Sequence, residues 1–320
     1  MKRDVVVIHE HPEWQQPLFA ALERRSVSFG VIDLKSAAFA DDDPFDAQLY
    51  FNQASPSAYL RGNTRAVPAG LALLRTLEQR GALVLNGAAA FALELSKSAQ
   101  AALLHRLDVD HPRSVTFNDV DALRRRALPF GWPAMLKPDQ GGSGARMQLV
   151  ASMADVEAYF ANDPAVWLPD NLFLLQEYLD SDPAQGIVRL EMLGSELLYA
   201  MRVVTHGRYN LCPAPVCNPD DGGGAGACHV DVVSHKPVEF HPYPDVPRDA
   251  VDAARHIMRA ANIDIGGIEY LTTRDGRRVF YDINANSNLR WSIGAAFGFD
   301  PFERVVDYLL SRLVSPRFGA

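Results

Sequence analysis

The sequence is poor in cysteine, which limits the metal sites and crosslinks that it can form. Its 320 residues include three cysteines, Cys212, Cys217 and Cys228, and His229 follows the last of them. Their C-x4-C-x10-C-H spacing is looser than the paired spacings of structural zinc sites. We therefore expect reduced, unpaired thiols in a Pro- and Gly-rich loop, with a zinc site as the alternative.

Long hydrophobic runs and an excess of positive charge are also missing. No apolar run approaches the length of a membrane span, and the first residues lead directly into a strand. We therefore expect a cytoplasmic protein with no membrane partner. Acidic residues outnumber basic ones by 39 to 31, and the net charge is −8. This balance argues against broad binding to nucleic acid, so an anionic ligand has to be met by a few placed cations.

The N-terminal part lacks a dinucleotide-binding motif. The sequence predicts apolar strands at 4–8, 27–33, 47–51 and 82–86. Helical stretches near 14–25 and 66–80 separate them, and this alternation predicts a parallel α/β lobe. The residues after the first strand contain no G-x-G-x-x-G motif. We expect this lobe to serve the acceptor substrate or the scaffold.

A β-hairpin is predicted in the last part of the chain. Two β-prone runs, 268–272 and 278–284, flank an Asp-Gly pair at 275–276, which is a strong hairpin signal. A two-residue loop at this pair places Glu269 directly opposite Asp282. The sequence therefore predicts that two carboxylates face each other across the hairpin.

This hairpin is also the predicted metal site. Asn284 lies on the same face as Asp282, because side chains alternate along a strand. Opposed carboxylates repel each other, and no cation in the local sequence is aimed between Glu269 and Asp282. Mg²⁺ prefers oxygen ligands, so these three residues are predicted to hold it. A surface hairpin with solvated carboxylates is the alternative.

A glycine-rich turn follows a strand in the middle of the chain. Residues 130–150 are predicted to form a strand that carries Lys137, a turn at 141–144 and a second strand. Small residues let backbone N–H groups converge on phosphate oxygens, and a lysine on the preceding strand can reach the same phosphates. A strand–loop–strand order does not match a P-loop. The stretch predicts a lid over phosphates, with an ordinary glycine hairpin as the alternative.

Two further stretches suggest nucleotide contacts. The apolar strand at 171–180 ends in polar groups, which suits an adenine slot, although the segment alone is an ordinary core strand. A second hairpin is predicted around Gly194-Ser195, and with 195 and 196 as its central residues Arg189 pairs directly with Arg202. Two adjacent arginines repel each other and need an anion, such as a transferring phosphate, between them. Solvated arginines are the alternative.

Taken in order, these features resemble the ATP-grasp superfamily, and they are most similar to the glutathione synthetase and RimK-type carboxylate–amine ligases. No single motif is decisive, whereas the ordered series is. The series consists of Lys97, Lys137 with its glycine loop, Gln176-Glu177, Arg189 and Arg202, and then Glu269, Asp282 and Asn284.

The resemblance implies an α/β fold of the ATP-grasp (α+β) type. A Rossmann-like N-terminal lobe is expected at 1–87, a central subdomain with the glycine-rich lid at 88–178, and a C-terminal subdomain with the Mg²⁺ site at 179–320. ATP is expected to be clamped between the antiparallel sheets of the last two lobes.

The resemblance also implies ATP and Mg²⁺ as cofactors, with Mn²⁺ as an alternative ion. Glu269, Asp282 and Asn284 are expected to hold the metal, and Arg202 and Arg290 to be catalytic. The implied nucleotide-binding residues are Lys97, Lys137, Gly141, Gly142, Ser143, Gly144, Gln176, Glu177, Tyr178, Leu179 and Arg189.

The sequence departs from the family pattern in two places. Ile187 stands where an acidic residue commonly precedes the first arginine by two positions, and the Pro that often follows the metal-binding Asn is missing after Asn284. The identity of the acceptor substrate is therefore not carried over from any one member.

The implied function is an ATP-dependent carboxylate–amine ligase. It would form an amide or peptide bond through an acylphosphate and release ADP and phosphate. The expected partners are small-molecule carboxylate and amine substrates, such as amino acids or peptides, and a homodimer through the first lobe is a further expectation. A small-molecule kinase on the same fold and a non-catalytic nucleotide-binding protein are the alternatives.

Overall fold

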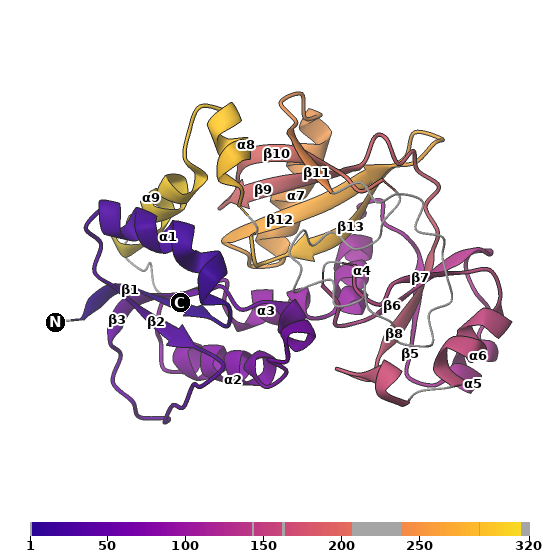
Figure 1. Cartoon of the computed structure of the whole chain (residues 1–320), viewed down its shortest axis with the longest axis horizontal. Coiled ribbons are helices and arrows are strands. Elements are labelled where there is room, and N and C mark those ends of the chain that lie inside the picture. The colour runs from indigo at the N-terminus through magenta and orange to yellow at the C-terminus, as the bar shows by residue number, and fades with distance from the viewer. Residues whose placement is uncertain (1, 143, 162–163, 207–237, 288, 315–320) are drawn as a thin grey trace.

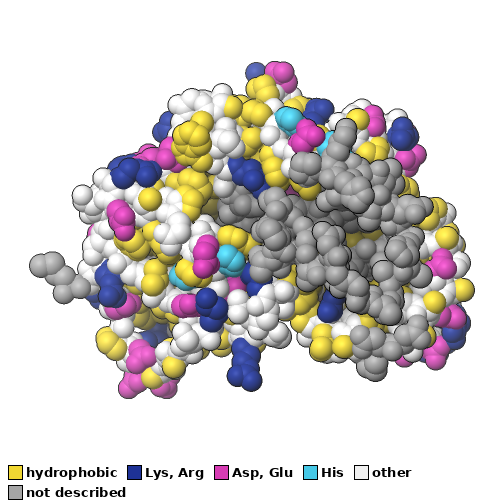
Figure 2. Space-filling model, viewed as in Figure 1, with side chains coloured by type: hydrophobic (Ala, Val, Ile, Leu, Met, Phe, Trp, Pro, Cys, Tyr) yellow, Lys and Arg dark blue, Asp and Glu magenta, His cyan; other side chains and the backbone are white. Residues whose placement is uncertain are grey.

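The computed structural model describes residues 2–142, 144–161, 164–206, 238–287 and 289–314. Its described strands form three sheets, and Figure 1 shows the first and second at opposite ends of the molecule with the third above them. On the face drawn in Figure 2, basic and acidic side chains are interspersed. No helix in the described part of the chain has the length and apolar content needed to cross a bilayer.

The first sheet is parallel, as predicted, with the order β2-β1-β3-β4. Its strands are β1 (Arg3–His9), β2 (Phe29–Asp33), β3 (Ala47–Asn52) and β4 (Val84–Leu85). Val6 and Ile8 of β1 pack toward α2 (Ala66–Gln79), whereas Val5 and Val7 pack toward α1 (Pro12–Arg24). Burial on both faces explains the continuous apolar run of β1.

The last helix, α9 (Pro301–Val314), returns to this first sheet and packs beside α1 (Figure 1). Val305, Val306 and Leu309 join the apolar cluster of β1 and β3. On the outer side, the Nε atom of Arg24 lies 2.8 Å from an oxygen of Glu303. The two ends of the described chain therefore share one core.

The second sheet is antiparallel with the order β5-β8-β6-β7. Its strands are β5 (Ser114–Phe117), β6 (Ala134–Pro138), β7 (Gln148–Val150) and β8 (Phe173–Glu177). The helices beside it are α5 (Val120–Arg124), α6 (Met153–Ala161) and the 3-10 turn η2 (Pro164–Trp167). Ala134 pairs with Val150, which confirms the predicted strand–loop–strand order around the glycine turn.

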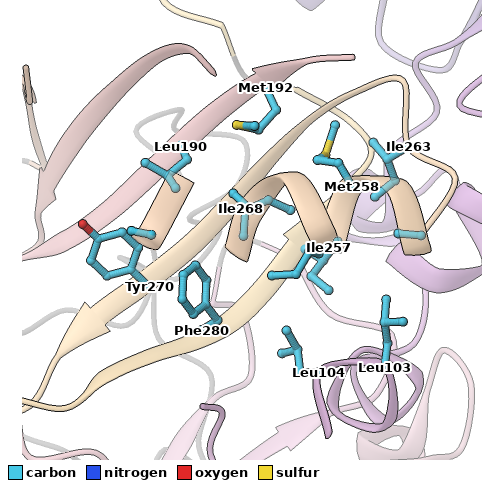
Figure 3. Packing of buried hydrophobic residues seen from close by; sticks show 14 of the residues in the cluster. Leu103, Leu104, Leu190, Met192, Ile257, Met258, Ile263, Ile268, Tyr270 and Phe280 are labelled. Carbon is cyan, nitrogen blue, oxygen red and sulfur yellow. The ribbon is translucent and has the colours of Figure 1, made fainter. Parts of the chain in front are cut away.

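The third sheet is antiparallel with the order β11-β10-β9-β12-β13. Its strands are β9 (Ile187–Leu193), β10 (Glu196–Val204), β11 (Glu239–Pro242), β12 (Ile265–Thr272) and β13 (Arg278–Asn284). The helices near it are α3 (Ala88–Glu94), α4 (Lys97–Arg106), α7 (Arg248–Ala260) and α8 (Trp291–Ala296). Figure 3 shows Leu104 of α4 and Ile257 of α7 beside Ile268 and Phe280 of this sheet.

The Ala- and Leu-rich run at 88–107 forms two helices, α3 and α4, because the Ser96 hydroxyl accepts the N–H of Ala99 and starts a new helix. One local prediction was wrong. The loop between β12 and β13 runs over 273–277 instead of two residues, because Thr273 and Arg277 hydrogen-bond through their backbones and the Thr273 hydroxyl.

Each sheet lies within one of the three predicted domain ranges, 1–87, 88–178 and 179–320. Three of the described helices pack against a sheet from a different range. Residues of α3 and α4 contribute to the core of the third sheet, and residues of α9 contribute to the core of the first. The boundaries themselves stay predictions. The predicted loop and linker at 205–245, with its cysteines, lies mostly outside the described residues.

The buried side chain of Asn86 joins the first sheet to the third. Its Nδ2 donates to the carbonyls of Ile265 (2.7 Å) and Ala285 (2.6 Å), and its Oδ1 accepts from the N–H groups of Asp264 and Ile265. We expect Asn86→Ala to lower the free energy of unfolding by more than about 2 kcal/mol, because buried backbone groups lose their partners. Urea unfolding checks this, and the exposed Asn118→Ala is the control. Equal stability of the two variants would contradict the proposed junction.

Candidate active site

A cavity of about 560 Å³ is lined by residues from all three sheets. Its walls include Phe51 of β3, Lys137 of β6, Gln176 of β8, Arg189 of β9 and Asp282 of β13. Segments that are far apart in the sequence therefore meet at one site.

The cavity brings together most of the predicted site residues. Those that line it are Lys97, Lys137, Gly141, Gly142, Gly144, Gln176, Glu177, Tyr178, Leu179, Arg189, Glu269, Asp282, Asn284 and Arg290. Ser143 lies outside the described residues. Arg202 is not among the described residues that line the cavity.

The start of α4 places one of the two predicted phosphate-binding lysines. Asp139, which follows β6, accepts hydrogen bonds from the Ser96 hydroxyl (2.8 Å) and the Ser98 N–H (2.7 Å). The N–H of Lys97 donates to the Asp139 carbonyl. These bonds tie the first turn of α4 to the strand that carries Lys137, so the two lysines come from different elements but are held near each other.

Lys137 is buried in the wall of the cavity. Burial, followed by the charge of Lys97, lowers the pKa of Lys137 to about 8. Two nearby ammonium groups at a cavity wall are stabilised by an anion placed between them. The arrangement therefore suits phosphate oxygens.

The register of the predicted metal hairpin is confirmed at its centre. Glu269 pairs with Asp282, and beyond this pair a β-bulge shifts the register so that Tyr270 faces Phe280. The bulge leaves Tyr281 as an extra residue, and its hydroxyl donates to Glu269 at 3.0 Å. Both Tyr281 and Asp282 consequently line the cavity.

Protein cations meet both of these carboxylates, although none of them comes from the local sequence of the hairpin. The guanidinium of Arg189 donates to Glu269 (2.8 Å) and Glu191 (2.6 Å), and the ammonium of Lys97 pairs with Asp282. Both cations come from elements outside the hairpin, so its local sequence does not reveal them. The two carboxylates therefore have protein partners in the absence of a metal.

The predicted metal ligands fit a hard cation. Glu269, Asp282 and Asn284 line the same cavity, and the Asn284 amide lies 3.2 Å from an Asp282 oxygen. Within the described parts of the chain, no group of three or more His, Cys, Asp or Glu is placed to hold a metal ion. Two carboxylates and an amide are sufficient for Mg²⁺ when substrate phosphates and water supply the remaining ligands.

Glu177, the charged residue of the predicted adenine segment, forms ion pairs with two arginines. The Glu177 carboxylate accepts from Arg113 Nε (3.1 Å), and Arg277 lies 3.5 Å away. Burial alone would raise the pKa of Glu177, but the hydrogen bonds and charge of Arg113 outweigh it and leave the pKa lowered. These ion pairs join the end of β8 to the β12–β13 loop. Their role toward a nucleotide stays a prediction.

The glycine turn lies against the first lobe. A Cβ atom on Gly142 would lie 2.5 Å from the Cβ of Ser57, so no side chain fits at this position without a shift. Gly144 has a φ angle of +73°, which favours glycine. The turn therefore has steric reasons for its composition, and its function as a lid stays a prediction.

The predicted pairing of Arg189 with Arg202 was wrong. Leu193 pairs with Glu196, so the turn is Gly194-Ser195 and not 195–196, and a bulge at Leu198 then leaves Arg189 facing Met201 and Arg202 facing Val188. A shift of one residue moves a side chain to the other face of the sheet. Arg202 instead lies over the ring of Tyr243, 5.0 Å from its centroid.

Arg290, the other predicted catalytic residue, does line the cavity. Its guanidinium lies 3.3 Å from the centroid of the Phe240 ring, and its backbone N–H donates to the hydroxyl of Tyr199. These contacts fix the residue at the start of α8.

Sequence reasoning missed Glu94, the last residue of α3. Its side chain lines the cavity and is only 2% exposed, and one oxygen accepts the N–H of Asn286 at 3.1 Å. The other oxygen has no hydrogen-bond partner among the described residues. Burial raises the pKa of Glu94 to about 8. The signal in the sequence was a glutamate in an apolar Ala- and Leu-rich run.

We expect Glu269→Gln to lower the free energy of unfolding by roughly 2–4 kcal/mol, because buried Arg189 loses one of its two carboxylate partners. The sequence alone implied the opposite, since removing a repelling carboxylate should not destabilise the ligand-free protein. Urea unfolding measures the change. The exposed Glu196→Gln is the matched control and should change stability by less than about 0.5 kcal/mol.

The raised pKa of Glu94 also predicts a pH dependence. Between its ordinary value of 4.5 and about 8, the folded protein keeps a proton that the unfolded chain releases, so stability falls as the pH rises. The Glu94→Gln variant has no carboxyl group at this position, so its stability should not fall with pH for this reason. Its stability relative to wild type should rise by up to about 1.4 kcal/mol per pH unit toward pH ~8 in urea unfolding. The exposed Glu23→Gln should show no such trend, and a flat difference for Glu94→Gln would contradict the assignment.

Comparisons with known proteins were made at the level of both sequence and structure. No family model matches the chain. The carbamoyl phosphate synthase large chain of Rubrobacter xylanophilus is 26% identical over 176 residues, which are 51% of this chain and 16% of that protein. This chain thus matches less than a fifth of the length of that curated relative.

Solved structures match over nearly the full chain. The ATP-grasp ligase PsnB, complexed with a minimal precursor, has a TM-score of 0.65 and 19% identity and covers 98% of this chain and 100% of its own. A RimK domain ATP-grasp protein of Sphaerobacter thermophilus matches with a TM-score of 0.68 and 17% identity, and the match covers 96% of this chain and 99% of that protein. The VanG D-Ala:D-Ser ligase of Enterococcus faecalis matches with a TM-score of 0.68 and 14% identity, and the match covers 98% of this chain and 100% of the ligase. The chain therefore has the fold of the ATP-grasp superfamily, as its ordered motifs predicted.

Proposed function

We propose that this chain is an enzyme, an ATP-grasp ligase that joins a carboxylate to an amine and releases ADP and phosphate. The observation that carries the proposal is one cavity shared by Lys97, Lys137 and the Glu269/Asp282/Asn284 group. Phosphoryl transfer needs positioned cations and little further chemistry from the protein. The fold shared with PsnB and VanG supports the same reaction class.

ATP and Mg²⁺ are the proposed cofactors. One neighbouring structure, that of PsnB, contains Mg and ADP, and another contains AMPPNP. In this chain Glu269, Asp282 and Asn284 would hold the metal, which when bound offsets the negative charge of the phosphates. Gln176, with the residues up to Leu179, would line the adenine. Mn²⁺ in place of Mg²⁺ stays a prediction.

The protein's own residues account for the remaining requirements of the reaction. Lys97 and Lys137 would hold the phosphates, and Arg290 would bind the carboxylate group that attacks the γ-phosphate and becomes an acylphosphate. The glycine turn beside Ser57 would keep water from this intermediate. The amine of the second substrate then displaces phosphate and leaves an amide.

The proposed substrates are small molecules or peptides with a free carboxylate and a free amine. PsnB was solved with a precursor peptide, and VanG is named a D-Ala:D-Ser ligase, so the fold accommodates both kinds. The cavity volume of about 560 Å³ lies in the range of sites that bind small molecules.

Release of ADP with paired amino acids and peptides, in the presence of Mg²⁺, tests the proposal. Hydroxylamine should trap an acylphosphate as a hydroxamate. Lys137→Ala should lower turnover by roughly 100-fold, because a charge that stabilises the transferred phosphate is lost. The exposed Lys35→Ala is the control. A phosphorylated product that survives hydroxylamine would support a kinase instead, and ATP binding without turnover on any pair would contradict the ligase proposal.

A further inference from the structure

One end of the cavity is apolar, in contrast to the end that holds the lysines and carboxylates. The side chains that line this apolar end come from α1, β3, β12, the segment before α8, and α9. They are Leu18, Phe51, Ile265, Leu289, Phe302 and Val305, and all six belong to the same hydrophobic cluster. The apolar end therefore lies where α9 returns to the first sheet.

This apolar end is made of different elements from the proposed nucleotide site. The adenine segment at 176–179 and the lysines come from the second sheet and from α4, whereas the apolar end is built by the first lobe, the start of β12, the segment before α8, and α9. A nucleotide held by the former elements leaves the apolar end for another ligand. The apolar end is thus available to a substrate.

Two polar residues that follow Phe51 and line the cavity are engaged with other protein groups, and Gln15 of α1 also lines the cavity near Leu18. The amide of Gln53 donates to the Asn52 carbonyl at 3.1 Å, and the Ser55 hydroxyl lies 2.8 Å from that of Ser57. A charged or polar group placed against the apolar wall would lose its water without gaining a full set of partners. An aliphatic or aromatic side chain has no polar group whose hydration is lost there, and it removes apolar surface from water.

Leu289 and Arg290 are consecutive, and both line the cavity. One residue of the apolar end is therefore joined directly to the residue that is proposed to bind a carboxylate, and both face the same cavity. A molecule that carries an apolar side chain next to a carboxylate matches this pair of surfaces.

We propose that the carboxylate substrate of this enzyme bears an apolar aliphatic or aromatic side chain, which occupies the end of the cavity formed by Leu18, Phe51, Ile265, Leu289, Phe302 and Val305. This inference rests on the proposed ligase function and narrows its substrate class. The apolar end is then a specificity pocket, and it makes no contact with the reacting atoms.

Two carboxylates of similar size test the pocket first. With a common set of amines, leucine should support ADP release with a kcat/KM at least about 10-fold higher than asparagine, because the amide of asparagine loses its hydration at the apolar wall. Equal values for leucine and asparagine would overturn the inference while leaving the ligase function intact.

A variant at a half-buried residue of the pocket tests its location, because a change at one of the fully buried residues would also disturb the core. Leu289→Phe should lower kcat/KM for leucine and leave that for alanine and the Kd of MgADP unchanged, because the new ring occupies the space of the substrate side chain. Leu168→Phe, the same change at a leucine that is 51% exposed, should have no effect. Leu289→Ala, which enlarges the pocket and adds no bulk, should shift the preference from leucine toward phenylalanine. Unchanged preferences in both Leu289 variants would place the side chain elsewhere and overturn the inference.

Failure of the ligase function gives a different result. No ADP release with any pair would contradict the proposed reaction, and the pocket would then be tested by binding alone. Calorimetric titration of the MgADP complex should show tighter binding of leucine than of asparagine, and the Leu289→Phe variant should lose this difference. Equal binding of the two amino acids would overturn the apolar pocket independently of catalysis.

Discussion

The buried charge of Arg189 is the constraint on which the cavity depends. Its guanidinium lies between Glu191 on its own strand and Glu269 on the neighbouring strand, and burial of such a charge is tolerated only with close partners. The attraction of the two carboxylates raises the pKa of Arg189 despite its burial. Gly267 is required beside it, because a Cβ there would lie 2.4 Å from a guanidinium nitrogen.

The carboxylates around this arginine are met by cations of the protein. Glu191 and Glu269 pair with Arg189, and Asp282 pairs with Lys97 and lies within the field of Lys137. Burial and the charge of Asp282 raise the pKa of Glu269, whereas Lys97 outweighs the effect of burial and leaves the pKa of Asp282 lowered. A metal ion at this place therefore has to share Glu269 and Asp282 with Arg189 and Lys97.

The cavity exists because three junctions hold the sheets together. Asn86 joins the first sheet to the third, Asp139 joins the second sheet to α4, and α4 packs on the third sheet (Figure 3). Asn286 adds a bond from its side chain to the carbonyl of Gln53 in the first lobe. The proposed catalytic groups are thus positioned by polar contacts between lobes and by the shared core of α4.

The sequence by itself determined the regular elements and the local pairs. Alternating apolar strands and helices gave the parallel first sheet, and the β-prone runs on either side of the Asp-Gly pair gave the hairpin. The pairing of Glu269 with Asp282 needs the bulge at Tyr281 as well, because the five-residue loop alone leaves the two strands one residue out of the predicted register. The order of the lysines, the glycine turn and the carboxylates indicated the fold. These features depend on side-chain period and turn chemistry, which are local properties.

Tertiary structure alone decided which charges meet. A single extra residue at Leu198 moved Arg202 to the opposite face from Arg189, and strand propensity does not reveal a bulge of this kind. Lys97 and Arg189 reach the carboxylates from elements far away in the sequence, and Glu94 becomes an acid with a raised pKa only through burial between lobes. Such partners are set by the packing of distant segments, so no local pattern in the sequence specifies them.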